Sequence, residues 1–179
     1  MKVLAFAASN SSQSINKALV THAAELLQNN TGAEFEVLDL NDFEMPIYSS
    51  DRENESGIPA PAQAFRKKIG EADVILISFA EYNGSYTAAY KNVFDWTSRI
   101  DQKVYQNKKA VLLATSPGQG GAQSVLNSAV GSAPYFALDV KGSLSVPSFY
   151  DNFDSEQGVL TNDELSQQLI KQLSLLSEV

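Results

Sequence analysis

Four short apolar runs, separated by amphipathic stretches, constrain the fold of this chain more than any other feature of its sequence. They cover residues 2–7, 35–40, 74–79 and 110–115, and a weaker fifth run at residues 140–146 is interrupted by Gly142. The third run contains Val74-Ile75-Leu76-Ile77, four consecutive branched apolar residues. Near-continuous apolarity is typical of parallel strands that helices cover on both faces. The runs therefore predict five strands of a parallel sheet.

Helical patterns occupy the stretches between the strands, at residues 14–30, 61–72, 86–100, 121–132 and from Thr161 onward. In the last of these, Glu164 follows Thr161 by three residues, which predicts a capping box. Strands that alternate with helices imply right-handed crossovers and a layered α/β architecture. A length of 179 residues suits one domain. We therefore expect a single domain over residues 1–179, with a three-layer, doubly wound, five-stranded parallel sheet.

Two connections, Asn41–Ala60 and Pro147–Thr161, are longer than usual for a compact domain. Loops of more than about 12–15 residues are commonly functional or disordered. The second of them carries Phe149, Tyr150 and Phe153. Both a functional role and a plain surface insertion remain open for each loop at this point.

The composition excludes several classes of function. The chain has 13 basic and 21 acidic residues, a net charge of −8, which argues against binding to nucleic acid or to an anionic membrane. It has no cysteine and one histidine, so disulfides, thiolate nucleophiles and cysteine-ligated metals are excluded, and we expect no metal site. The histidine, His22, lies on the apolar stripe of the first helix and is expected to be structural. No apolar run approaches a membrane span, and we expect a cytoplasmic protein.

The first candidate binding segment follows the first strand and reads Ser9-Asn10-Ser11-Ser12-Gln13-Ser14-Ile15-Asn16. In an open parallel sheet, ligands bind beyond the carboxyl ends of the strands. Four serines and two asparagines at the start of a helix make a neutral cradle for a phosphate. The segment matches neither the P-loop nor the dinucleotide fingerprint. The alternative is a turn rich in N-cap residues without a ligand.

Two further loops follow the third and fourth strands. The segment Glu81–Tyr86 contains Asn83-Gly84, a strong turn signal, and its tyrosine, amide and glycine suit a planar heterocycle. The alternative is an ordinary turn with Tyr82 packed inward. The segment Ser116–Gly121 has three glycines, which either free backbone amides for a ligand or permit tight turns.

Together, the three loops resemble the NADPH-dependent FMN reductase family of flavodoxin-like proteins, whose members include azo-, quinone- and chromate-reducing enzymes. The family's phosphate loop, roughly GSxRxxSxN, corresponds to Ala8–Asn16. Its flavin-ring motif, PEYNxSxxxxLKNAIDW, corresponds to Ala80–Trp96, and its SPGxxGG segment to Ser116–Gly121 with one residue fewer. Ser11 stands where the family usually has arginine, and Ala80 where it usually has proline. The loss of the arginine puts a preference for NADPH over NADH in doubt.

The resemblance implies a sheet of order 2-1-3-4-5 and an FMN-dependent NAD(P)H oxidoreductase. Hydride would pass from NADPH or NADH to FMN and then to a small acceptor: a flavin, a quinone, an azo compound or a metal oxyanion. No catalytic acid or base is expected, because the flavin carries the chemistry. The residues implied in FMN binding are Ser9, Ser11, Ser14, Ile15 and Asn16 at the phosphate, and Glu81, Tyr82, Asn83, Gly84, Ser85, Ser116 and Gly118 at the isoalloxazine.

The resemblance also implies a homodimer or homotetramer with the flavin near the subunit interface, and Asn92 and Trp96 are candidate interface residues. Two alternatives remain. One is a flavodoxin-type electron carrier, although its phosphate loop would normally read more like [ST]-x-T-G-x-T. The other is a flavin-binding protein without catalytic activity.

Overall fold

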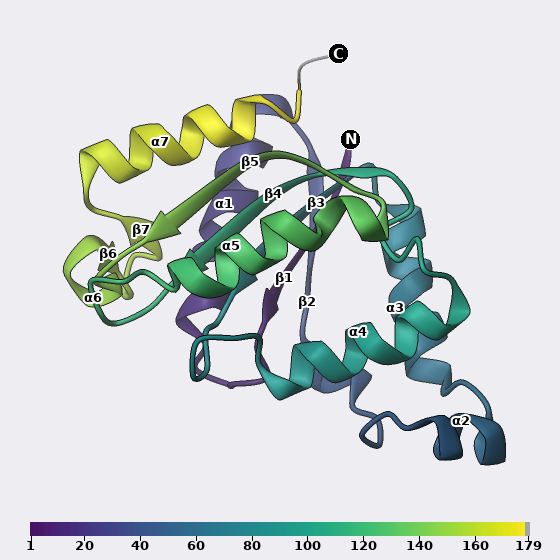
Figure 1. Ribbon diagram of the computed structural model, residues 1–179. Helices are drawn as coiled ribbons and strands as arrows, with labels where there is room; N and C mark the ends of the chain where they lie inside the picture. The colour runs from purple at the N-terminus through teal and green to yellow at the C-terminus, as the bar shows by residue number, and fades with distance from the viewer. Residues whose placement is uncertain (178–179) are drawn as a thin grey trace.

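A five-stranded parallel sheet with the order β2-β1-β3-β4-β5 forms the centre of the molecule, as predicted (Figure 1). The computed structural model describes residues 1–177. The strands are β1 (Lys2–Ala8), β2 (Glu34–Leu38), β3 (Val74–Phe79), β4 (Lys108–Thr115) and β5 (Leu138–Val146). All four strand pairings within this sheet are parallel.

Helices cover both faces of the sheet and complete the three layers. The helices are α1 (Ile15–Thr31), α2 (Ser50–Ser56), α3 (Ala60–Glu71), α4 (Ala88–Ile100), α5 (Gln123–Ser132), α6 (Phe149–Asn152) and α7 (Asp163–Ser174), with short 3-10 helices η1 (Leu40–Phe43) and η2 (Ala133–Phe136). A small hairpin joins β6 (Phe153–Asp154) and β7 (Val159–Leu160). Helices α1 and α7 pack on one face of the sheet, and α3, α4 and α5 pack on the other (Figure 1).

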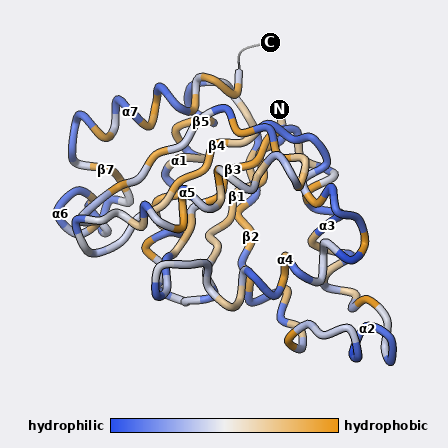
Figure 2. The backbone as a smooth tube through the Cα atoms, viewed as in Figure 1, coloured by the Kyte–Doolittle hydropathy of each residue, from blue (hydrophilic) through white to orange (hydrophobic). Residues whose placement is uncertain are grey.

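Strand β3 shows why its sequence is almost entirely apolar. All six of its residues are buried. Ile75, Ile77 and Phe79 belong to the apolar cluster under α3, α4 and α5, whereas Val74 and Leu76 belong to the cluster under α1 and α7. Successive side chains therefore enter opposite layers, and hydrophobic segments coincide with the central strands in Figure 2. Full burial of each such side chain contributes about 1.5–3 kcal/mol.

The ends of several elements differ from the sequence prediction, by two residues at the start of β4, β5 and α5. Strand β2 ends at Leu38 because η1 begins at Leu40. Helix α4 begins at Ala88 because Thr87 is its N-cap and accepts a hydrogen bond from the Tyr90 N–H at 3.2 Å. The capping box predicted at Thr161 is wrong, since Asn162 is the N-cap of α7.

Asn92 and Trp96 were predicted at a subunit interface, and the burial of Trp96 contradicts this for the tryptophan. Trp96 is only 1% exposed, and its indole N–H donates to the Pro46 carbonyl at 2.7 Å. The Asn92 amide accepts from the Tyr48 N–H at 2.9 Å and donates to the Met45 carbonyl at 3.0 Å. Both side chains hold residues 45–48 against α4. The apolar periodicity of the helix predicted that this face would lie outside the core, but residues 45–48 fold back over it.

The two long connections contain structure of their own. Residues 41–60 include most of η1 and all of α2, and residues 147–161 include α6 and the β6–β7 hairpin. His22 is buried, and its Nε2 accepts a hydrogen bond from the Leu160 N–H at 3.5 Å, so it is structural as predicted. Burial lowers the pKa of His22, partly offset by the nearby Glu25 carboxylate. No helix within residues 1–177 is long and apolar enough to cross a membrane.

Candidate functional site

The loops after β1, β3 and β4 meet at a cavity of about 220 Å³ beyond the carboxyl ends of the strands. The predicted residues that line this cavity are Ser9, Ser11, Ser14, Ile15, Asn16, Glu81, Tyr82 and Ser116. The other four predicted residues, Asn83, Gly84, Ser85 and Gly118, lie in the same loops but outside this lining. The parallel topology therefore brings together segments that are about a hundred residues apart, as the sequence analysis anticipated.

Three serine hydroxyls shape the first loop by accepting backbone hydrogen bonds. Ser9 Oγ accepts from the Ser11 N–H at 3.2 Å, Ser11 Oγ from the Gln13 N–H at 3.3 Å, and Ser14 Oγ from the Lys17 N–H at 3.2 Å. A hydroxyl that accepts in this way keeps its O–H for donation. The same loop ends at the start of α1, where the first N–H groups have no partner within the helix. These donors together fit a phosphate group.

Asn16 contributes differently from the serines, because its side chain points into the protein. Its Oδ1 accepts from the Ser78 hydroxyl at 2.7 Å and from the Thr115 N–H at 3.0 Å. Its Nδ2 donates to the Thr115 carbonyl at 3.1 Å. The amide thus ties the start of α1 to the ends of β3 and β4, and the backbone N–H of Asn16 makes none of these three hydrogen bonds.

The cradle has little positive charge of its own. Lys17, in the first turn of α1, forms an ion pair with Asp39 at 2.7 Å. The hydrogen bond from Lys17, followed by one from the Asn41 N–H, lowers the pKa of Asp39. Ser11 stands where the family pattern has arginine, so the donors that this loop offers are hydroxyl and backbone N–H groups.

The second loop is a tight hairpin. The Tyr82 N–H donates to the Ser85 carbonyl at 3.0 Å, and the Ser85 N–H donates back to the Tyr82 carbonyl at 3.2 Å. Asn83 and Gly84 have φ values of 53° and 78°, as a type I′ turn requires. Tyr82 is 52% exposed, so the alternative in which its ring packs into the core is wrong. Its ring is available at the cavity wall.

Two contacts that the sequence did not predict hold this hairpin in place. Glu81 Oε2 accepts a hydrogen bond from the Val125 N–H at 2.9 Å, at the start of α5, where the N-cap residue Ala122 offers no side-chain cap. A carboxylate at a helix N-terminus is favourable. Thr87 Oγ1 donates to the Ala8 carbonyl at 3.0 Å, at the end of β1. The hairpin is therefore fixed to α5 on one side and to the end of β1 on the other.

The third loop is tied to the segment after β5. The Ser116 carbonyl accepts from the Phe149 N–H at 3.0 Å, and the Gly118 carbonyl accepts from the Ser148 N–H at 2.9 Å. Gly121 has a φ of 57°, and a Cβ there would lie 2.2 Å from Ser145 Oγ, so only glycine fits. Tight turning thus explains Gly121.

Five lining residues were not among the predicted site residues: Gln13, Ala80, Thr115, Pro117 and Tyr150. Four of them lie next to predicted residues in the three loops. Tyr150 comes from the connection after β5, and the one sequence signal for it was an aromatic residue in an unusually long loop. Within residues 1–177, no cluster of three or more His, Asp or Glu side chains could hold a metal ion.

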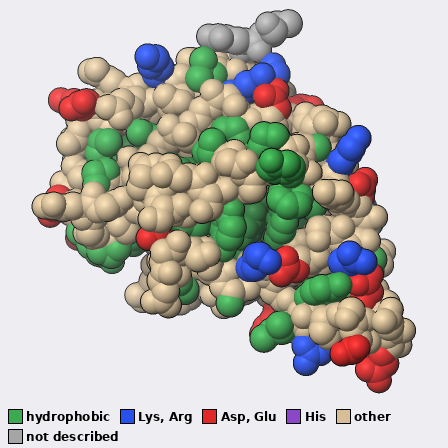
Figure 3. All heavy atoms as spheres, in the orientation of Figure 1, with side chains coloured by type: hydrophobic (Ala, Val, Ile, Leu, Met, Phe, Trp, Pro, Cys, Tyr) green, Lys and Arg blue, Asp and Glu red, His purple; other side chains and the backbone are tan. Residues whose placement is uncertain are grey.

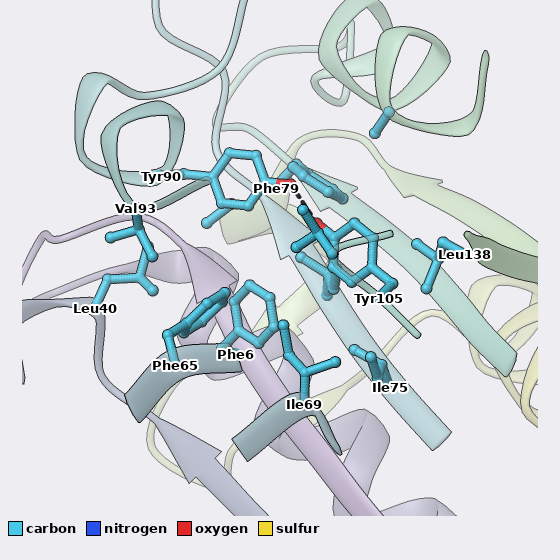
Figure 4. Packing of buried hydrophobic residues seen from close by; sticks show 14 of the residues in the cluster. Phe6, Leu40, Phe65, Ile69, Ile75, Phe79, Tyr90, Val93, Tyr105 and Leu138 are labelled. Atoms are coloured by element: carbon cyan, nitrogen blue, oxygen red, sulfur yellow. Dashed lines mark hydrogen bonds between the residues drawn. The ribbon is translucent and has the colours of Figure 1, made fainter. Parts of the chain in front are cut away.

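A second, apolar cavity of about 360 Å³ lies between α4 and α5. Its lining includes Phe79, Tyr86, Tyr90, Phe94, Tyr105 and Phe136. Hydrophobic side chains gather around this hollow on the face shown in Figure 3. Figure 4 shows the Tyr90 and Tyr105 hydroxyls pointing toward one another, 2.5 Å apart, and burial raises the pKa of both.

Comparison with known proteins places the chain in a family. The sequence model of the NADPH-dependent FMN reductase family matches residues 1–151. An NAD(P)H:quinone oxidoreductase of Solanum tuberosum is 34% identical over 177 residues, covering 94% of this chain and 87% of that protein. An NAD(P)H-dependent FMN reductase of Pseudomonas aeruginosa is 31% identical, covering 98% and 93%. Among solved structures, FerB, a flavoenzyme NAD(P)H:(acceptor) oxidoreductase of Paracoccus denitrificans, has the same fold, with a TM-score of 0.73, 23% identity, and 98% and 95% coverage. The chain belongs to the NADPH-dependent FMN reductase family.

Proposed function

We propose that this chain binds FMN with its phosphate in the serine-lined cavity and reduces a quinone at the expense of NAD(P)H. The family accounts for the enzyme class and for the dependence on FMN and NAD(P)H. The assignment of the site rests on the hydroxyls of Ser9, Ser11 and Ser14. Each hydroxyl oxygen accepts a backbone N–H of the loop, so its own O–H can donate to a ligand. The donors left over suit a phosphate monoester.

In this proposal, the protein binds and orients while the cofactor reacts. FMN supplies a ring that accepts hydride from a nicotinamide and passes electrons to an acceptor. The three serine hydroxyls and the N–H groups of Ile15 and Asn16 bind the phosphate. Tyr82 provides a flat surface beside the ring.

Backbone donors complete the ring site. The Ser85 N–H is occupied by the Tyr82 carbonyl. The N–H groups of Asn83, Gly84 and Gly118 donate no hydrogen bond within the described part of the chain. We therefore assign to these three groups the stabilisation of negative charge that builds up on the reduced ring.

A binding titration tests the site. Quenching of flavin fluorescence should show tighter binding of FMN than of FAD, because the cavity is built for one terminal phosphate. Equal or tighter binding of FAD would contradict the proposed site. Oxidation of NADH or NADPH by a simple quinone, without a partner protein, should follow, whereas an electron carrier would need a partner and a non-catalytic binder would give no turnover.

We further propose that the apolar cavity between α4 and α5 is covered by a second copy of the chain. Its aromatic lining is costly to leave in water, and the Lys91–Asp95 ion pair beside it offers both charges to a symmetry-related copy. Ser128 is exposed and lines the cavity, so Ser128→Arg should block association without disturbing the core. Sedimentation should show a dimer or tetramer for the unaltered protein and a smaller species for the variant. An unaltered monomer would contradict this part of the proposal.

The surroundings of the enzyme are also part of the proposal. We place it in the cytoplasm, where NAD(P)H is available, and assign it no nucleic-acid or membrane partner, because its net charge is −8. Cell fractionation tests the location.

A further inference from the structure

Tyr150 is an exposed aromatic residue on the wall of the site, and none of the three binding motifs includes it. We propose that its hydroxyl donates a hydrogen bond to the phosphate of the bound flavin, which makes Tyr150 a fourth contributor beside Ser9, Ser11 and Ser14. This inference rests on the FMN site proposed above and extends it to the connection after β5.

The backbone around Tyr150 is fixed before any ligand binds. The Phe149 N–H donates to the Ser116 carbonyl at 3.0 Å, and the Ser148 N–H donates to the Gly118 carbonyl at 2.9 Å. The Asn152 amide donates to the Pro147 carbonyl at 2.9 Å, and Ser148 adopts a left-handed φ of 45° to begin the short helix α6. The segment that carries Tyr150 is thus part of the third loop's framework, so the residue is presented to the cavity at little entropic cost on binding.

The cavity lining places Tyr150 near the start of α1. Tyr150 lines the same cavity as Ser14 and Ile15. Its neighbour Phe149 is buried in the apolar cluster beneath α1 and α7, where it stacks on Phe153 with ring centroids 4.6 Å apart. Tyr150 lies away from the α4–α5 face.

The small size of the cavity supports the proposal that Tyr150 and the serines contact the same ligand. At about 220 Å³ it is smaller than the roughly 300–1,000 Å³ that encloses a drug-sized molecule. Ser9, Ser14 and Tyr150 all line it, as do Glu81, Tyr82 and Ser116. A flavin phosphate bound by the serines therefore lies in the same small cavity as Tyr150.

Tyr150 also supplies what this cradle lacks. It is 68% exposed, and its hydroxyl forms no hydrogen bond with the described residues, while its ring contacts Phe149 edge-on at 5.4 Å. The cradle has serine instead of arginine at position 11, and Lys17 is paired with Asp39. A doubly charged phosphate in a site without a free cation gains from each additional O–H donor, since hydrogen bonds to anions are about twice as strong as neutral ones.

Tyr150→Phe removes the hydroxyl and keeps the ring. Tyr135→Phe is the matched control, because Tyr135 is 74% exposed and lies on η2, at the amino-terminal end of β5, whereas Tyr150 follows the carboxyl end of that strand. Each protein is titrated with FMN and with riboflavin, which lacks the phosphate, by fluorescence quenching. Tyr150→Phe should weaken FMN binding about tenfold and riboflavin binding less than twofold. Tyr135→Phe should change neither.

Two results would overturn the inference: unchanged FMN affinity in Tyr150→Phe, or an equal loss of affinity for FMN and riboflavin. Either result leaves the FMN site itself standing if the unaltered protein binds FMN and Ser9→Ala weakens FMN selectively. Absence of FMN binding by the unaltered protein contradicts the proposed site as a whole. The urea midpoint of Tyr150→Phe should match that of the unaltered protein, because the hydroxyl is exposed and unpaired.

Discussion

Replacing Asn16 with alanine separates the architecture of the site from its ligand contacts. The Asn16 amide holds the Thr115 N–H, the Thr115 carbonyl and the Ser78 hydroxyl, at distances of 2.7–3.1 Å. Thr115 and Ser78 are almost completely buried. The Ser78 hydroxyl can rotate toward another acceptor, but the two backbone groups of Thr115 cannot move without disturbing β4.

The expected loss follows from those two fixed groups. A buried polar group left without a partner costs about 1–3 kcal/mol. Two such groups predict a loss of about 2–6 kcal/mol in the free energy of unfolding. That is a large part of the roughly 5–15 kcal/mol available to a domain. Urea denaturation of the flavin-free protein measures it.

The flavin titration supplies the second half of the test. Asn16→Ala should weaken FMN and riboflavin by similar factors, because the lost amide shapes the loop and does not touch the phosphate. Asn16→Asp is a matched variant: it keeps Oδ1 but places an oxygen against the Thr115 carbonyl. It should be unstable at neutral pH and recover as the pH falls and the carboxyl gains a proton. A stability loss below about 1 kcal/mol together with a selective loss of FMN binding would refute the reasoning and make the Asn16 side chain a direct phosphate ligand.

Four further predictions follow from the structure and the sequence. Ser9→Ala should weaken FMN binding by about 10- to 150-fold, the value of a charge-assisted hydrogen bond of ~1.5–3 kcal/mol, with riboflavin nearly unaffected; equal losses in the titration would show that the loop matters through folding alone. Ser14→Ala should do the same and also lose about 1 kcal/mol of stability in urea, because Ser14 is the N-cap of α1. Burial lowers the folded-state pKa of His22, so its contribution to stability is present above an unfolded pKa of about 6.5 and is lost as the pH falls. The urea midpoint of the protein should therefore drop from pH 7 to pH 5. If the midpoint of His22→Gln depended on pH just as steeply, this prediction would be contradicted. In steady-state kinetics, the preference for NADPH over NADH should be under about 30-fold and should rise in Ser11→Arg, whereas a hundredfold preference in the unaltered protein would place the recognition residue elsewhere.

Much of the fold could be predicted because its signals are local. An apolar strand such as Val74–Phe79 must be covered by other elements on both faces of the sheet. An amphipathic helix can provide that cover by packing its apolar stripe against the sheet. Because the strands are parallel, their carboxyl ends lie at the same end of the sheet. The sequence alone therefore predicts that the loops beginning at Ser9, Glu81 and Ser116 lie close together. The turn at Asn83-Gly84 was equally local, since both residues tolerate a positive φ.

What only the tertiary structure decided is the partner of each polar side chain. Asn16 reaches Thr115, 99 residues away, and Glu81 caps α5 through Val125, because crossovers bring those backbone groups near. Trp96 is covered because residues 45–48 fold over α4, and Tyr150 joins the site because the connection after β5 bonds to the third loop. Periodicity reports which face of an element is apolar, but it has no information about which distant backbone group ends up within 3 Å. Those long-range pairings separate the residues that shape this site from the residues that are free to bind its ligand.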